Sequence, residues 1–142
     1  MWWRRGLLSV RRAPGPGAPP ACQYRGCVPI SVSRVFSFEA AHQLEWHSGA
    51  CKNLHGHSYR LEVTVAGDVN ADGIVIDFAD LQRVVEAEVI DRFDHTYLND
   101  LLPNPTAELI ATDIWKRLAT AGLAVSHVVL WETDNSKVEI TA

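Results

Sequence analysis

Hydrophobic residues alternate with polar ones in several short segments, a pattern typical of strands that bury one face. Leu61 to Val65 shows the alternation most cleanly, and Val32 to Phe38 shows it with an interruption at Val35. Turn-forming residues separate the other segments, at Asn70-Ala71-Asp72-Gly73 and at Asp134-Asn135-Ser136. The predicted strands are 32–38, about 57–65, 74–76, 127–133 and 137–141.

In two segments in the middle of the chain, apolar residues recur every three or four positions, which is the period of an amphipathic helix. The first segment begins at Asp77, a good N-cap residue, and runs to about Ile90. The second opens at Asn104-Pro105-Thr106, where proline suits the first helical turn, and ends at Gly122. Apart from the short strand 74–76, the predicted strands form one pair before and one pair after two consecutive helices. This order, ββααββ, predicts an α+β domain with a four-stranded antiparallel sheet.

The first 29 residues differ in composition from the rest of the chain. They contain five arginines, no acidic residue, and the run 13–20, whose prolines and glycines break helices and strands. We interpret residues 1–29 as a disordered or leader extension and residues 30–142 as a single domain. Arginine-rich leaders without acidic residues also occur as organelle transit peptides, so targeting is an open alternative.

The charge of the domain narrows the range of its partners. The chain has 17 acidic and 13 basic residues, a formal charge of −4, and five of the basic residues lie in the extension. The acidic remainder argues against a broad nucleic-acid surface, because phosphates bind clustered lysine and arginine. No stretch approaches the roughly 20 apolar residues that a membrane-spanning helix needs.

Cysteine usage indicates a reducing compartment. Cys22 and Cys27 lie in the extension, which leaves Cys51 as the only cysteine of the domain. Cysteines so placed do not make a disulfide framework, and we therefore expect a cytoplasmic protein.

His55-Gly56-His57 is the sharpest chemical feature of the sequence. Residues two apart on a strand project from the same face, so both imidazoles reach one metal ion. His42 ends the first predicted strand and lies beside them if the first two strands form a hairpin. Three histidines would leave a zinc ion an open position for water or substrate, which marks a catalytic site. Taken alone, an H-x-H pair equally fits two buried histidines with hydrogen-bond partners.

Three further features add candidate chemistry. Cys51 precedes His55 by four residues and is a base or nucleophile, a fourth zinc ligand, or an inert core residue. Asp94-His95 is a possible proton-relay dyad, or a solvent-facing loop at the end of a helix. Glu132 alternates with apolar residues on a predicted strand, which indicates a carboxylate in a pocket unless the strand lies at a sheet edge.

Four motifs occur in the order Phe38-Glu39-Ala40-Ala41-His42, Cys51-Lys52-Asn53-Leu54-His55-Gly56-His57, Asp94-His95-Thr96-Tyr97-Leu98-Asn99 and Glu132-Thr133. Between them lie Gly73-Ile74-Val75-Ile76-Asp77-Phe78 and Asn104-Pro105-Thr106-Ala107-Glu108. From about residue 31 to the end, this combination resembles the 6-pyruvoyl/6-carboxy-tetrahydropterin synthase family. The set is more specific than any one motif.

The resemblance implies the tunnelling (T-) fold, a homohexamer of paired trimers, and active sites shared between subunits. It implies zinc on His42, His55 and His57, and 7,8-dihydroneopterin triphosphate as the substrate. Cys51 would be the general base, and Asp94 and His95 would relay protons. The same resemblance assigns the remaining candidates to the pterin: Glu132 anchors its 2-amino and N3 positions, and Thr106 and Glu108 line its pocket. A substrate held on zinc needs the open position, which argues against Cys51 as a fourth ligand.

The spacing between Cys51 and His55 bears on the reaction. The short run resembles 6-carboxytetrahydropterin synthase of queuosine precursor synthesis, a lyase that releases acetaldehyde and triphosphate, and Asn104-Pro105-Thr106 leans the same way. The runner-up is 6-pyruvoyltetrahydropterin synthase, toward which Glu132-Thr133-Asp134-Asn135 leans. Two alternatives belong to other functional classes. One is a non-catalytic zinc-binding module with a Cys-His₃ site, and the other is a metal hydrolase.

Overall fold

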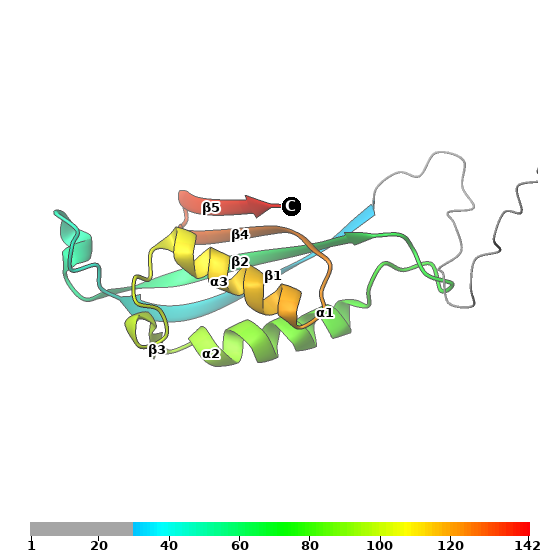
Figure 1. Cartoon of the computed structure of the whole chain (residues 1–142), viewed down its shortest axis with the longest axis horizontal. Helices are drawn as coiled ribbons and strands as arrows, with labels where there is room; N and C mark the ends of the chain where they lie inside the picture. Colours follow the sequence, from blue (N-terminus) through cyan, green and yellow to red (C-terminus); the bar gives the residue numbers. More distant parts are fainter. Residues whose placement is uncertain (1–29) are drawn as a thin grey trace, which may run out of the picture.

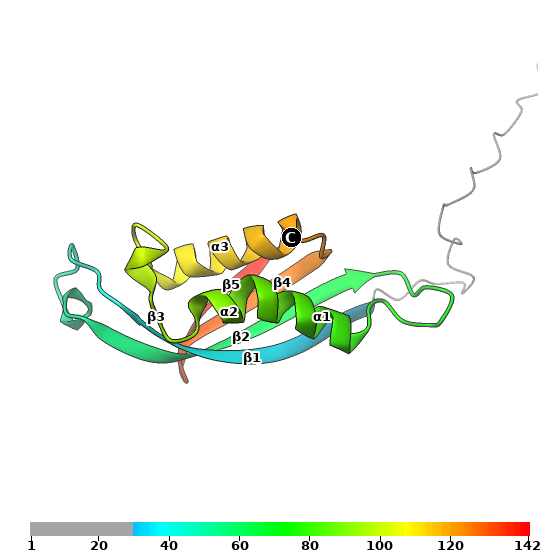
Figure 2. The same cartoon turned by 90° about the horizontal axis from the view of Figure 1, so that it is seen from below.

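A five-stranded sheet in the order β3-β1-β2-β4-β5 forms one layer, and the long helices lie across one of its faces (Figures 1 and 2). The computed structural model describes residues 30–142, so the extension expected at 1–29 lies outside the described residues. The observed architecture confirms the predicted α+β class. The strands are β1 (Ile30–His42), β2 (His55–Gly67), β3 (Thr96–Tyr97), β4 (Val125–Thr133) and β5 (Ser136–Thr141).

β1 and β2 form a long antiparallel hairpin that carries the candidate site at its loop end. Strand alternation buries Phe38, Ala40 and His42 on the face under the helices and leaves Glu39 between them exposed. The connecting loop contains a single 3₁₀ turn, Ala50–Lys52. β2 then pairs with β4, and β4 with β5, both antiparallel.

The helices begin and end at residues whose chemistry predicts those boundaries. The Asp77 carboxylate accepts a hydrogen bond from the Ala79 N–H at 2.7 Å and caps α1 (Phe78–Val85). This helix continues through a π-helical turn (Glu86–Ile90) into α2 (Asp91–Phe93). Thr106 caps α3 (Ala107–Thr120), which ends before Gly122 at a positive φ of 91°. The sequence suggested that Pro105 lies in the first helical turn. In the structure, Pro105 instead precedes the N-cap residue.

The hydrophobic core lies between the sheet and these helices. Leu61, Val63 and Leu130 from the sheet and Leu81 and Ile114 from the helices are all 0% exposed. Full burial of one such side chain contributes about 1.5–3 kcal/mol. None of the helices within residues 30–142 is long and apolar enough to cross a membrane.

Two details of the predicted strands were wrong. The sheet has a fifth strand, β3, whose two residues pair parallel with Ala40 and Ala41 of β1 and are too few to show an alternation. Residues 74–76 form no strand, because the turn before them holds Ile74: its N–H donates to the Asn70 side chain, and its carbonyl accepts from the Asn70 N–H.

Candidate functional site

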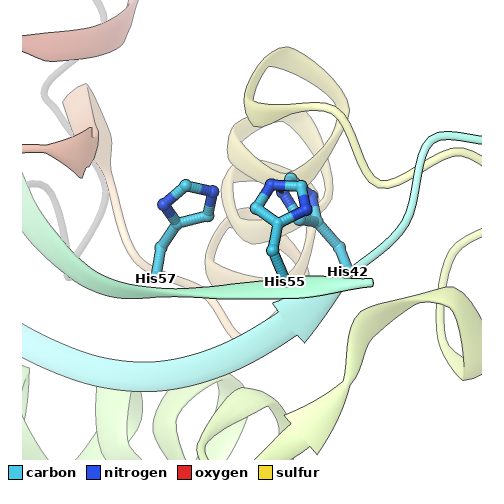
Figure 3. A group of neighbouring side chains, drawn as sticks. All are labelled: His42, His55 and His57. Carbon is cyan, nitrogen blue, oxygen red and sulfur yellow. Dashed lines mark hydrogen bonds between the residues drawn. The ribbon is translucent and has the colours of Figure 1, made fainter. Parts of the chain in front are cut away.

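Three histidines meet on the helix-covered face of the sheet, at the loop end of the β1–β2 hairpin (Figure 3). His42 ends β1 and lies opposite His55, the first residue of β2, while His57 lies opposite Ala40. Their ligand atoms lie within 4.8 Å of one another. The strand register thus brings together the three residues singled out in the sequence.

Gly56, between two of these histidines, allows the two strands to approach closely. A Cβ atom at this position would lie 3.2 Å from the carbonyl oxygen of Ala40, a tight contact with backbone. A larger residue would push β1 and β2 apart at the point where the histidines converge.

Hydrogen bonds to backbone carbonyls orient two of the imidazoles. Nδ1 of His42 lies 2.8 Å from the Pro105 carbonyl oxygen, and Nδ1 of His55 lies 2.8 Å from the Asn53 carbonyl oxygen. A carbonyl accepts only, so each Nδ1 donates, and in the neutral form of each ring Nε2 presents a lone pair. The two Nε2 atoms are 3.0 Å apart. A cation shared between them, either a proton or a metal ion, would stabilise this contact.

His57 completes the set with a third ring nitrogen that faces the other two. Its Nε2 is buried and has no hydrogen-bond partner. Burial lowers the pKa of His57 and the neighbouring His42 and His55 lower it further, while the Glu132 carboxylate acts in the opposite direction. Three imidazoles that converge, two with their Nδ1 at carbonyls, fit the donor set and second shell of a histidine-bound metal ion.

Glu132 of β4 lies next to the triad on the same face of the sheet. One of its oxygens is 3.6 Å from Nε2 of His42 and 3.8 Å from Nε2 of His57, and its side chain is 26% exposed. The carboxylate is therefore neither at a free sheet edge nor fully solvated. It stands at the wall of the site, where it can accept hydrogen bonds from a ligand.

A pocket of about 330 Å³ opens beside the triad and is lined in part by His42, Cys51, Thr106, Glu108 and Glu132. Cys51 is half-buried in the 3₁₀ turn of the β1–β2 loop. Within residues 30–142, the histidine triad is the group of ligand atoms close enough to share a metal ion, and Cys51 is not part of it. The structure thus brings five sequence-predicted residues to one pocket, with the thiol outside the metal-binding group.

Asp94 and His95 do not line the pocket beside the triad. Asp94 accepts a hydrogen bond from the Glu39 N–H at 2.8 Å, and its other oxygen is 2.9 Å from Nδ1 of His95. The Glu39 backbone bond, with the contact to His95, lowers the pKa of Asp94. His95 has a φ of 57°, a left-handed conformation that is costly for a residue other than glycine. Such strain is often found at functional sites.

His95 lines a second pocket, of about 460 Å³, whose lining also includes Glu39, Ser58 and the β2 residue His57. Glu39 and Ser58 alternate with the buried residues of β1 and β2, so this pocket opens on the side of the sheet opposite the histidines. Within one chain, the structure therefore does not bring Asp94 and His95 to the triad.

Several residues of the site gave no signal in the sequence. The carbonyls of Pro105 and Asn53 orient histidines through their backbone, which any residue type supplies. Tyr59 is 0% exposed and its hydroxyl has no hydrogen-bond partner. Burial raises the pKa of Tyr59, and the charges of Glu132 and Cys51, followed by the proximity of the Glu132 carboxylate to the hydroxyl, raise it further. Its position two residues after His57 on the same strand face could have revealed it.

Residues 31–142 match the family model of 6-pyruvoyl tetrahydropterin synthase. Several curated relatives are named 6-carboxy-5,6,7,8-tetrahydropterin synthase, and that of Synechocystis sp. is 44% identical over 105 residues, which cover 69% of this chain and 81% of the relative. A dihydroneopterin monophosphate aldolase of Pyrococcus furiosus is 37% identical over 110 residues, covering 73% of this chain and 90% of the relative.

Among solved structures, 6-pyruvoyl tetrahydropterin synthase of Caenorhabditis elegans superposes with a TM-score of 0.72 at 25% identity, covering 81% of this chain and 96% of that one. This likeness confirms the tunnelling fold expected from the motifs. The family model covers the part of the chain that carries the three histidines. The chain belongs to the 6-pyruvoyl tetrahydropterin synthase family.

Proposed function

We propose that this protein is a zinc-dependent lyase that converts 7,8-dihydroneopterin triphosphate and water to 6-carboxy-5,6,7,8-tetrahydropterin, with release of acetaldehyde and triphosphate. The observation that carries the proposal is the convergence of three histidines, two with their Nε2 atoms 3.0 Å apart, beside a carboxylate-lined pocket. The product would serve the synthesis of queuosine and other 7-deazapurine precursors.

The family resemblance and the donor set together support zinc as the metal. Three imidazoles without a thiolate in the group would leave a fourth position open, as in catalytic zinc sites. A zinc ion at this site would bind and acidify the hydroxyl groups of the substrate side chain. His42, His55 and His57 would hold it, with the Pro105 and Asn53 carbonyls fixing the orientation of the first two rings.

The residues around the triad would bind the pterin and accept a proton from the substrate. Glu132 would accept the 2-amino and N3 hydrogens of the pterin, since a carboxylate accepts two neighbouring N–H groups side by side. Cys51, from the loop that lines the same pocket, would take a proton from the substrate side chain as general base. Thr106 and Glu108 line that pocket and would contact the pterin.

Asp94 and His95 would serve the site of another subunit. Their pocket opens on the other side of the sheet from the triad of their own chain, so a proton relay between dyad and triad needs a second copy. This supports an assembly with shared active sites, the homohexamer implied by the family. The relevant contact joins the dyad pocket of one chain to the triad pocket of its neighbour.

The alternative product is 6-pyruvoyltetrahydropterin, formed by loss of triphosphate without carbon–carbon cleavage. The likeness to the Caenorhabditis elegans structure favours this reading, while the names of several relatives favour the carboxy product. The loop places Cys51 only four residues before His55, and we expect the thiol to lie near enough to the metal to promote cleavage.

Product analysis decides between the two reactions. Purified protein is supplied with 7,8-dihydroneopterin triphosphate, and acetaldehyde is followed by NADH consumption with a coupled alcohol dehydrogenase while pterins are identified by mass spectrometry. Equal amounts of acetaldehyde and 6-carboxytetrahydropterin are expected. Triphosphate release without acetaldehyde would assign the pyruvoyl reaction, and no turnover of this substrate would reject the proposal.

A further inference from the structure

Tyr59 lies in the middle of the sheet, directly across from the proposed pterin anchor. The β2–β4 ladder pairs Arg60 with Trp131, so the next residues in this register, Tyr59 and Glu132, oppose each other on the helix-covered face. On its other side, the ring of Tyr59 stacks on Phe38 of β1, with centroids 4.9 Å apart and an interplanar angle of 13°. Packing thus holds the ring in one orientation.

The hydroxyl at the end of this ring is unusual because it is buried and unpaired. Tyr59 is 0% exposed, and its oxygen makes no hydrogen bond within the described chain. An unsatisfied buried hydroxyl is costly, and phenylalanine would fill the same space without that cost. The ring meets His57 edge-on, with centroids 5.5 Å apart, so Tyr59 lies where the hydrophobic core adjoins the triad. Its retention there calls for a functional reason.

A metal ion on the histidines would attract the Glu132 carboxylate away from a bound pterin, and the Tyr59 hydroxyl would offset this attraction. Its carboxylate oxygen is within 4 Å of Nε2 of both His42 and His57, at 3.6 and 3.8 Å. A carboxylate so close to a metal-binding group is drawn towards the cation, and each step in that direction moves it away from a pterin. An ionised carboxylate has about four acceptor positions, so a phenol can occupy an outer one while two N–H groups of a ligand occupy the others.

We propose that Tyr59 is a positioning residue for Glu132: its hydroxyl donates a hydrogen bond to the carboxylate when the pterin is bound and holds it at the ring, away from the histidine triad. The proposal rests on the proposed role of Glu132 as pterin anchor. It assigns the unpaired hydroxyl a partner on the neighbouring strand, next to it in the β2–β4 register.

The test compares two variants that each remove one buried hydroxyl. Tyr59→Phe removes the unpaired one beside the site. Thr64→Val removes one that is paired, since the Thr64 hydroxyl is 2.7 Å from that of Ser33 on the face of the sheet away from the triad, and Thr64 is only 7% exposed. Each full-length variant, with its bound metal, is measured for binding of 7,8-dihydroneopterin, for KM and kcat with the triphosphate, and for Tm.

Tyr59→Phe is expected to weaken 7,8-dihydroneopterin binding and to raise KM by about 10-fold, the loss typical of one hydrogen bond to a charged group, with metal content unchanged. Its Tm is expected to equal or exceed that of the wild type. Thr64→Val is expected to lower Tm and to leave binding and KM as they were. A merely structural Tyr59 would show the reverse, a lower Tm with KM unchanged.

Different results would refute the role of Tyr59 and the role of Glu132 as pterin anchor. Wild-type affinity and KM in Tyr59→Phe, alongside lost binding in Glu132→Gln, would overturn the role of Tyr59 and leave the anchor intact. Unchanged binding in Glu132→Gln would overturn the anchor, and with it the positioning role. Absence of pterin binding and turnover in the wild type would reject the proposed function itself.

Discussion

His42 and His55 face each other across the β1–β2 ladder with their Nε2 atoms 3.0 Å apart, and both rings have their other nitrogen at a backbone carbonyl. The two carbonyls belong to different segments of the chain, one to the segment before α3 and one to the hairpin loop itself. The site is therefore prepared by the fold, because the lone pairs converge before any ligand is considered.

We expect the protein to bind about one zinc ion per chain, as a three-histidine site does, and His55→Ala or His57→Ala to lose it. Each substitution removes one of three nitrogen ligands. Elemental analysis of the purified wild type and variants measures the effect. His127→Ala serves as a control, since His127 lies near Glu139 of β5, away from the triad. Full zinc occupancy in both triad variants would refute the assignment.

Cys51→Ala is expected to keep its zinc and its fold while turnover falls about 10²-fold or more, the range of general acid–base catalysis. The thiol lines the pocket but lies outside the metal-binding group. Metal content and rate are measured on the same preparation. Joint loss of zinc and activity would instead identify Cys51 as a ligand, which is the Cys-His₃ alternative.

Mixed oligomers test whether active sites are shared. Cys51→Ala and His95→Ala subunits, each inactive, are expected to regain activity when denatured together and refolded, because some sites then combine an intact Cys51 with an intact His95 of the neighbour.

The matched control for this experiment pairs Cys51→Ala with Glu132→Gln. Both residues line the same pocket of one chain, so mixing repairs no site. Recovery in the control pair, or none in the test pair, would contradict a dyad supplied by another subunit.

Acid is expected to weaken the Asp94 contacts. The pKa of Asp94 is lowered from its ordinary 3.8, chiefly by the Glu39 N–H and then by His95, so the carboxylate favours the folded state above that pH. The contribution is lost as the pH falls through the lowered value. The Tm difference between the wild type and Asp94→Asn should therefore shrink from pH 6 to about pH 3. A difference that is constant over this range would argue against the ionised pair.

Much of the local structure follows from the sequence because it depends on near neighbours. The period of two places His55 and His57 on one face, and Asp77 and Gly122 mark helix ends that the structure has at those residues. The motifs around the histidines were also sufficient to identify the family. Residues 74–76 show the limit of this reasoning, since apolar side chains alone do not give a segment a neighbouring strand to pair with.

Only the tertiary structure decided which distant groups meet. The Pro105 carbonyl reaches His42 across 63 positions of the chain, and Tyr59 opposes Glu132 through the register of β2 with β4. The contacts of Asp94 and His95 with Glu39 of β1 place this dyad beside a pocket on the side of the sheet away from the triad. Such relationships depend on strand pairing and packing summed over the whole chain, and no local pattern of side chains encodes them.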